Sequence, residues 1–127
     1  MTLKKIRLEL ARDREHPEGS ARHGYEFVGP LDEKGHLDPV AWKKHRERCR
    51  VKRFWLNEAD EIGHLVRKPG GQWAFHYGAG ADTDEDEGGY RFGNHTFAVG
   101  EYVSIREHDD DVMRTFRVVR VEALPAA

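Results

Sequence analysis

The sequence predicts a mainly β domain: a small closed or nearly closed antiparallel barrel of six to eight strands, with one short helix at about residues 39–49. Apolar residues alternate with polar ones in many short runs, which is the pattern of half-buried strands. Turn residues separate these runs, and a single segment has a helical pattern. Closure into a barrel would leave no unpaired sheet edge, and a two-sheet sandwich is the alternative.

The first two expected strands cover residues 4–10 and 24–31. In the first, Ile6, Leu8 and Leu10 share one face, and the residues between them are charged. The intervening segment is polar and contains proline and glycine, so we expect a loop there.

The expected helix covers residues 39–49. Asp38 has the side chain of a helix cap, and Pro39 stands at the first helical position, where no backbone donor is lost. Steps of three and four residues place one set of side chains on the buried face: Ala41, Trp42, His45 and Cys49.

Three further strands, at 50–56, 61–67 and 72–77, are joined by short turns and predict a meander. Residues 89–97 suggest a short irregular strand, and 101–107 and 112–121 complete the set. In the last segment, the apolar positions switch faces between one pair, Phe116 and Val118, and a second pair, Val119 and Val121. This switch indicates a β-bulge or burial on both sides.

The bulk composition indicates a single domain over residues 1–127. Charged residues make up 35% of the chain, but the net charge is only −2, which argues against a surface built entirely for polyanions. Cys49 is the single cysteine, so a reducing compartment is expected, and the N-terminus lacks the apolar stretch of a signal peptide. We therefore expect a cytoplasmic protein with no membrane segment.

The stretch HYGAGADTDEDEGGYRFGNH, residues 76–95, resembles a metal-binding loop because five carboxylates fall within residues 82–87. A calcium loop requires glycine at its sixth place and glutamate at its twelfth. Here those places hold Glu87 and Gly93. The preferred interpretation is that 82–87 form the solvated tip of a hairpin.

Three histidines are the candidates for a divalent metal site: His64, His76 and His95. Counting from the turn at Gly70, His64 and His76 should be near cross-strand neighbours. His95 follows the acidic segment and could return to the same region, with a loop carboxylate as a further ligand. The alternative is that these histidines line the polar face of a sheet, because no paired ligand motif is present. We expect no tightly held cofactor.

Residues 43–53 carry seven Lys or Arg and one Glu, and two aromatic residues follow. Cations beside aromatic rings can bind phosphates while the rings stack on bases. The candidates for nucleic-acid or anion binding are Lys43, Lys44, Arg46, Arg48, Arg50, Lys52, Arg53 and Trp55. Solvent-facing cations of a helix and a strand, or contact with the acidic segment of a second copy, would explain the same pattern.

No arrangement typical of catalysis is evident. The chain lacks a nucleophile elbow and the glycine-rich phosphate loops. Cys49 lies at the end of the helix, which disfavours a thiolate, and Ser104 near His108 has no evident orienting group. We therefore expect a binding module rather than an enzyme.

Four strings, RHGYEFVGPLD, CRVKRFW, HTFAVGEYVSIRE and TFRVV, resemble a group of small uncharacterised bacterial proteins over nearly the whole chain. The resemblance implies a bacterial origin and carries no activity. The resulting hypothesis is a binding or accessory module that contacts a protein partner or a second copy through charged patches. Single-stranded nucleic-acid binding through residues 43–55 and a metal-dependent enzyme with a histidine site are the alternatives.

Overall fold

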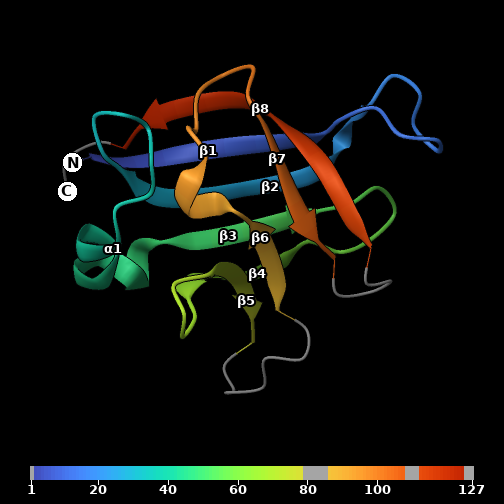
Figure 1. The fold of residues 1–127 in the computed structure, drawn as a ribbon. Helices are drawn as coiled ribbons and strands as arrows, with labels where there is room; N and C mark the ends of the chain where they lie inside the picture. Colours follow the sequence, from blue (N-terminus) through green and yellow to red (C-terminus); the bar gives the residue numbers. More distant parts are fainter. Residues whose placement is uncertain (1, 79–85, 108–111, 125–127) are drawn as a thin grey trace.

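Eight antiparallel strands form a closed barrel in the computed structural model, which describes residues 2–78, 86–107 and 112–124. The strands pair in chain order, and β8 pairs with β1 to close the barrel (Figure 1). They are β1 (Thr2–Leu10), β2 (Ser20–Leu31), β3 (Arg50–Phe54), β4 (Glu61–Arg67), β5 (Trp73–Tyr77), β6 (Glu87–Tyr90), β7 (Tyr102–Arg106) and β8 (Met113–Ala123). The predicted mainly β barrel is thus confirmed.

Helical structure in the described residues is confined to short segments. They are α1 (Pro39–His45) and the two 3-10 helices η1 (Arg46–Arg48) and η2 (Phe92–Asn94). The irregular strand expected over 89–97 is therefore wrong beyond Tyr90, because η2 interrupts it. No helix among these residues is both long and apolar enough to cross a membrane.

α1 begins where it was predicted to begin, but it ends earlier than predicted. Asp38 caps it, because the side-chain oxygen accepts hydrogen bonds from the backbone N–H groups of Val40 and Ala41 at 3.0 and 3.1 Å. Trp42 anchors the helix by donating its indole N–H to the Leu65 carbonyl at 2.8 Å. The expected single helix over 39–49 instead tightens into η1 after His45, and β3 begins at Arg50.

Aromatic side chains fill the middle of the barrel. Phe27 lies 5.2 Å from Phe75 and 5.7 Å from Phe97, measured between ring centroids. Phe92 occupies the space above Gly89, where an added Cβ would come within 2.5 Å of its ring. The inward-facing residues from the other strands include Ile6, Leu8, Tyr25, Leu65, Val103, Ile105, Phe116 and Val118. The middle of the barrel is therefore a packed core.

Two local predictions on the sheet are confirmed. The β4–β5 turn contains Gly70 and Gly71 at φ of +89° and +84°, a conformation that side chains with a Cβ rarely adopt. In β8, the pairing with β1 shifts so that Leu8 faces Val118 while Arg7 faces Arg120. Val119 is the extra residue of this bulge, and Val121 returns to the core side against Ile6.

Candidate functional site

The alternation of β3 divides the predicted basic segment into an outer and an inner part. Arg50 and Lys52 lie on the outer face, and Arg53 points into the barrel with only 2% of its surface exposed. Trp55 is half-buried and packs edge-on against His23 at 4.4 Å. The structure therefore does not place Arg53 and Trp55 with the other six candidates, because the period of two turns every second residue inward.

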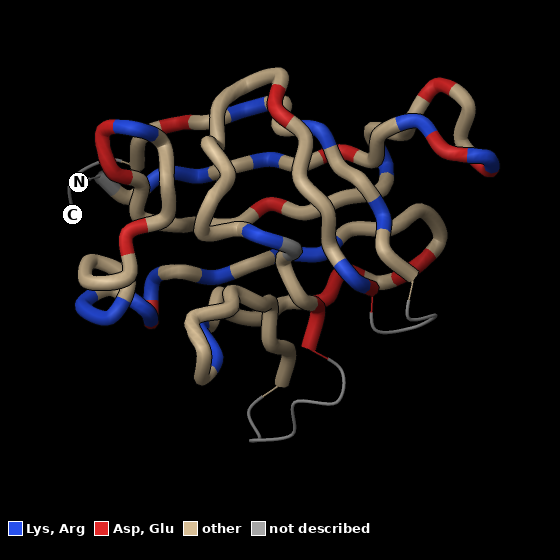
Figure 2. The backbone as a smooth tube through the Cα atoms, viewed as in Figure 1, with Lys and Arg blue, Asp and Glu red and all other residues tan. Residues whose placement is uncertain are grey.

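The six cations that remain at the surface form what we call the basic strip. Its members are Lys43, Lys44, Arg46, Arg48, Arg50 and Lys52. Figure 2 shows the strip as the run of blue along α1, η1 and β3. Among the described residues, none of the six takes part in an ion pair, whereas Lys5 and Arg7 on β1 both pair with Glu26. The positive charge of the strip is therefore left uncompensated by contact with these residues.

A shallow groove of about 380 Å³ adjoins the strip on the outer face of β1 to β4. We call it the strip groove; it is lined by Lys5, Glu26, Phe27, Val28, Arg50, Val51, Lys52 and Ile62. Lys52 is directly opposite Ile62, which is 49% exposed. Lys5 lies 3.3 Å from Glu26, so the groove's carboxylate is compensated. The groove thus combines aliphatic surface with the two cations of β3, of which Lys52 is the direct cross-strand neighbour of Glu26.

Arg53, the inward-facing residue of the basic segment, belongs to a group of ionisable residues inside one end of the barrel. We call this group the buried charge cluster; its members are Arg53, Glu87 and Glu107. Arg53 lies 3.6 Å from a Glu87 carboxylate oxygen and 3.7 Å from one of Glu107. Glu87 is fully buried and Glu107 is 3% exposed. Because these residues lie at or near strand ends, the cluster sits where β3 ends and β6 begins.

Neighbouring side chains satisfy much of the cluster. Tyr25 and Tyr77 donate their hydroxyls to one oxygen of Glu87 at 2.9 and 2.7 Å. Burial and the Glu87 charge raise the pKa of both tyrosines, so both remain donors. Arg114 donates its Nε–H to Glu107 at 3.1 Å.

One carboxylate oxygen of Glu107 is left unsatisfied by the described residues. Its Oε1 atom has no hydrogen-bond partner among the described residues. Burial raises its pKa to about 7, with the charge of Glu87 adding to the effect while Arg53 and Arg114 oppose it. This carboxyl therefore changes charge near neutral pH.

The two buried glutamates were not among the predicted site residues, and for Glu87 the prediction was wrong. We expected residues 82–87 to form a solvated tip, and 82–85 lie outside the described residues. Glu87 instead opens β6 opposite Phe75, where its side chain faces inward. For Glu107 a signal existed, because the inward period of Val103 and Ile105 continues to it.

The structure brings together two of the three candidate metal ligands. His64 and His76 are directly paired across β4 and β5 on the outer face, as predicted. His76 Nδ1 lies 2.5 Å from Asp86, which also pairs with Lys68 at 3.2 Å. His95 does not join them, since the described residues contain no group of three or more His, Cys, Asp or Glu that could hold a metal ion. The loop carboxylates before Asp86 lie outside these residues.

The two candidate nucleophiles, Cys49 and Ser104, are placed for packing or hydrogen bonding rather than for catalysis. Cys49 is fully buried, and burial raises its pKa to about 11 although Arg48 opposes the shift. The thiol is therefore protonated at neutral pH. Ser104 lies within 3.3 Å of the Thr115 hydroxyl across β7 and β8, and His108 is outside the described residues.

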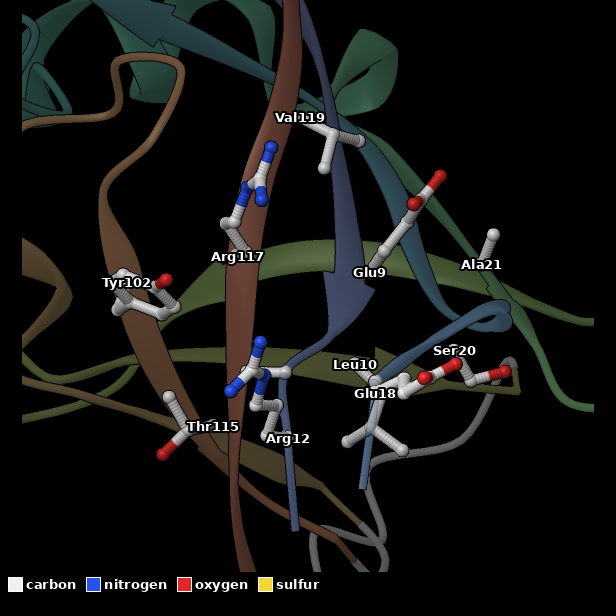
Figure 3. A pocket seen from close by; sticks show the side chains of 12 residues that line it. Glu9, Leu10, Arg12, Glu18, Ser20, Ala21, Tyr102, Thr115, Arg117 and Val119 are labelled. Carbon is white, nitrogen blue, oxygen red and sulfur yellow. The ribbon is translucent and has the colours of Figure 1, made fainter. Parts of the chain in front are cut away.

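A second surface groove, of about 850 Å³, lies over β1, β7 and β8. Figure 3 shows Tyr102 on one side of it and Glu9 and Glu18 on the other. Arg12 and Arg117 also line it, so the formal charges of its four ionisable acidic and basic groups cancel. This balance makes it a weaker candidate for an anionic ligand than the basic strip.

Comparison with known proteins leaves the function to be argued from the site. No protein family, no curated protein and no solved structure matches the chain. The resemblance to a group of small bacterial proteins therefore stays a prediction.

Proposed function

We propose that this protein is a non-enzymatic binding module that captures an acidic protein partner through the basic strip. One observation carries the proposal: six cations in ten residues, none of them ion-paired with a described residue. Such a patch attracts anionic surfaces and accelerates their association. The bacterial cytoplasm is the proposed compartment, because a lone buried thiol suits a reducing environment.

Single-stranded nucleic acid is the second candidate ligand. The positions of the aromatic residues argue against it. Phe54 is half-buried and its ring is covered by the Arg7 guanidinium at 4.4 Å. Trp55 is packed against His23 and Arg53. Neither ring is free to stack on bases, so a nucleic acid would rely on phosphate contacts. A metal-dependent enzyme is supported only by the His64–His76 pair among the described histidines.

Binding of a fluorescently labelled polyglutamate peptide, followed by anisotropy across a salt series, tests the proposal. We expect measurable binding that weakens with salt, since exposed charges are screened. The triple variant K43E/K44E/R48E should abolish it. The matched control is R14E/R22E/K34E, which changes the net charge equally at exposed cations outside the strip. Equal loss in both variants would show a net-charge effect and would overturn the proposal.

A further inference from the structure

The strip groove differs from the rest of the basic strip because aliphatic side chains form part of it. Val28 and Ile62 line it from β2 and β4, on either side of the outer face of β3. Ile62 leaves 49% of its surface exposed beside Lys52, its direct cross-strand partner. Side chains paired in this way have Cβ atoms about 5 Å apart. A ligand that contacts Ile62 is therefore also close to the Lys52 side chain.

The charges around the groove leave a net positive lining. The carboxylate of Glu26 is engaged by Lys5 and by Arg7, and its side chain is only 14% exposed. Arg50 and Lys52 take part in no contact ion pair with a described residue, although Glu26 is the direct cross-strand neighbour of Lys52. An incoming carboxylate can pair with either of these cations without breaking a contact ion pair in the described part of the chain.

The form of the groove favours a polypeptide over a nucleic acid. Its volume of about 380 Å³ is more than enough to take up one aliphatic side chain. Its apolar members are aliphatic at the surface, and Phe27 is 1% exposed, so the lining presents no free ring for a base. A peptide segment with an aliphatic side chain between carboxylates matches both the aliphatic lining and the positive charge of the groove.

We propose that the strip groove binds an acidic protein segment by taking up one of its aliphatic side chains between Val28 and Ile62, while neighbouring carboxylates pair with Arg50 and Lys52. The inference rests on the proposed function, since the basic strip supplies the general attraction. It adds the selectivity that a charged strip alone would lack.

Two labelled peptides test it, identical in length and in their Asp and Glu residues, with a central Leu in one and Ser in the other. We expect the Leu peptide to bind about fivefold more tightly, because a surface groove buries only part of the side chain. The variant I62S should remove the preference and leave affinity for the Ser peptide unchanged. The control V40S removes an aliphatic side chain that is 69% exposed and does not line the groove, so the preference should persist.

The possible results separate the two proposals. Equal affinity for the Leu and Ser peptides, with binding still abolished by K43E/K44E/R48E, would overturn the groove inference and leave the proposed function standing. Binding of neither peptide would overturn both. Tighter binding of a labelled oligothymidylate of equal charge would overturn the groove inference in favour of single-stranded nucleic acid. Circular dichroism of I62S confirms that the variant is folded.

Discussion

Replacing Glu107 by Gln should make the protein's stability less sensitive to pH. The carboxyl is 3% exposed, receives the Arg114 hydrogen bond and shares Arg53 with Glu87. Glutamine keeps an oxygen that can accept from Arg114, and it cannot ionise. The variant therefore imitates the protonated form of Glu107 at every pH.

The direction of the effect follows from proton linkage. Burial raises the pKa of Glu107 from 4.5 to about 7 in the folded protein. Between these values the folded state binds more protons than the unfolded state, so the free energy of unfolding falls as pH rises. The stabilisation is complete below the unfolded pKa and is lost as pH rises through the folded one. A shift of this size corresponds to roughly 3 kcal/mol.

Chemical denaturation of both proteins from acid to mildly alkaline pH measures the effect. The difference in unfolding free energy, variant minus wild type, should rise by roughly 3 kcal/mol across this window. The matched control is E101Q, at an exposed glutamate just before β7, and its difference should stay constant. A constant difference for E107Q as well would show that folding does not raise the pKa of Glu107 and would refute the argument.

Three further predictions concern other buried side chains. R53M should destabilise the fold by roughly 3–5 kcal/mol in denaturation at alkaline pH, and by less in acid, because Glu87 and Glu107 lose their shared cation. Y77F should cost roughly 1–3 kcal/mol in the same assay, because it removes the hydroxyl bonded to Glu87; an unchanged midpoint would contradict this. The Cys49 thiol should react with a thiol reagent only in denaturant, since it is buried and its pKa is about 11; rapid labelling of the native protein would contradict this.

Much of the architecture was predictable because the relevant signals are local. Period-two runs such as 4–10 establish strands wherever one face is buried. Asp38 followed by Pro39 marks a helix start through a backbone donor that needs a partner. The glycines at the β4–β5 turn allow a hairpin whose register places His64 opposite His76. Each of these features depends on residues close together in the chain.

The buried charge cluster depends on contacts between distant strands, which local patterns do not specify. Nothing in residues 82–87 alone distinguishes Glu87 from the acids before it; β6 begins there because Gly88 and Glu87 pair with β5. Arg53 can be buried inside the barrel because Glu87, on β6, and Glu107, just after β7, lie beside it. A buried charge is tolerated only when its partners are buried with it. Closure of β8 on β1 brings these strands around one interior, and in doing so it determines which cations remain on the outer face.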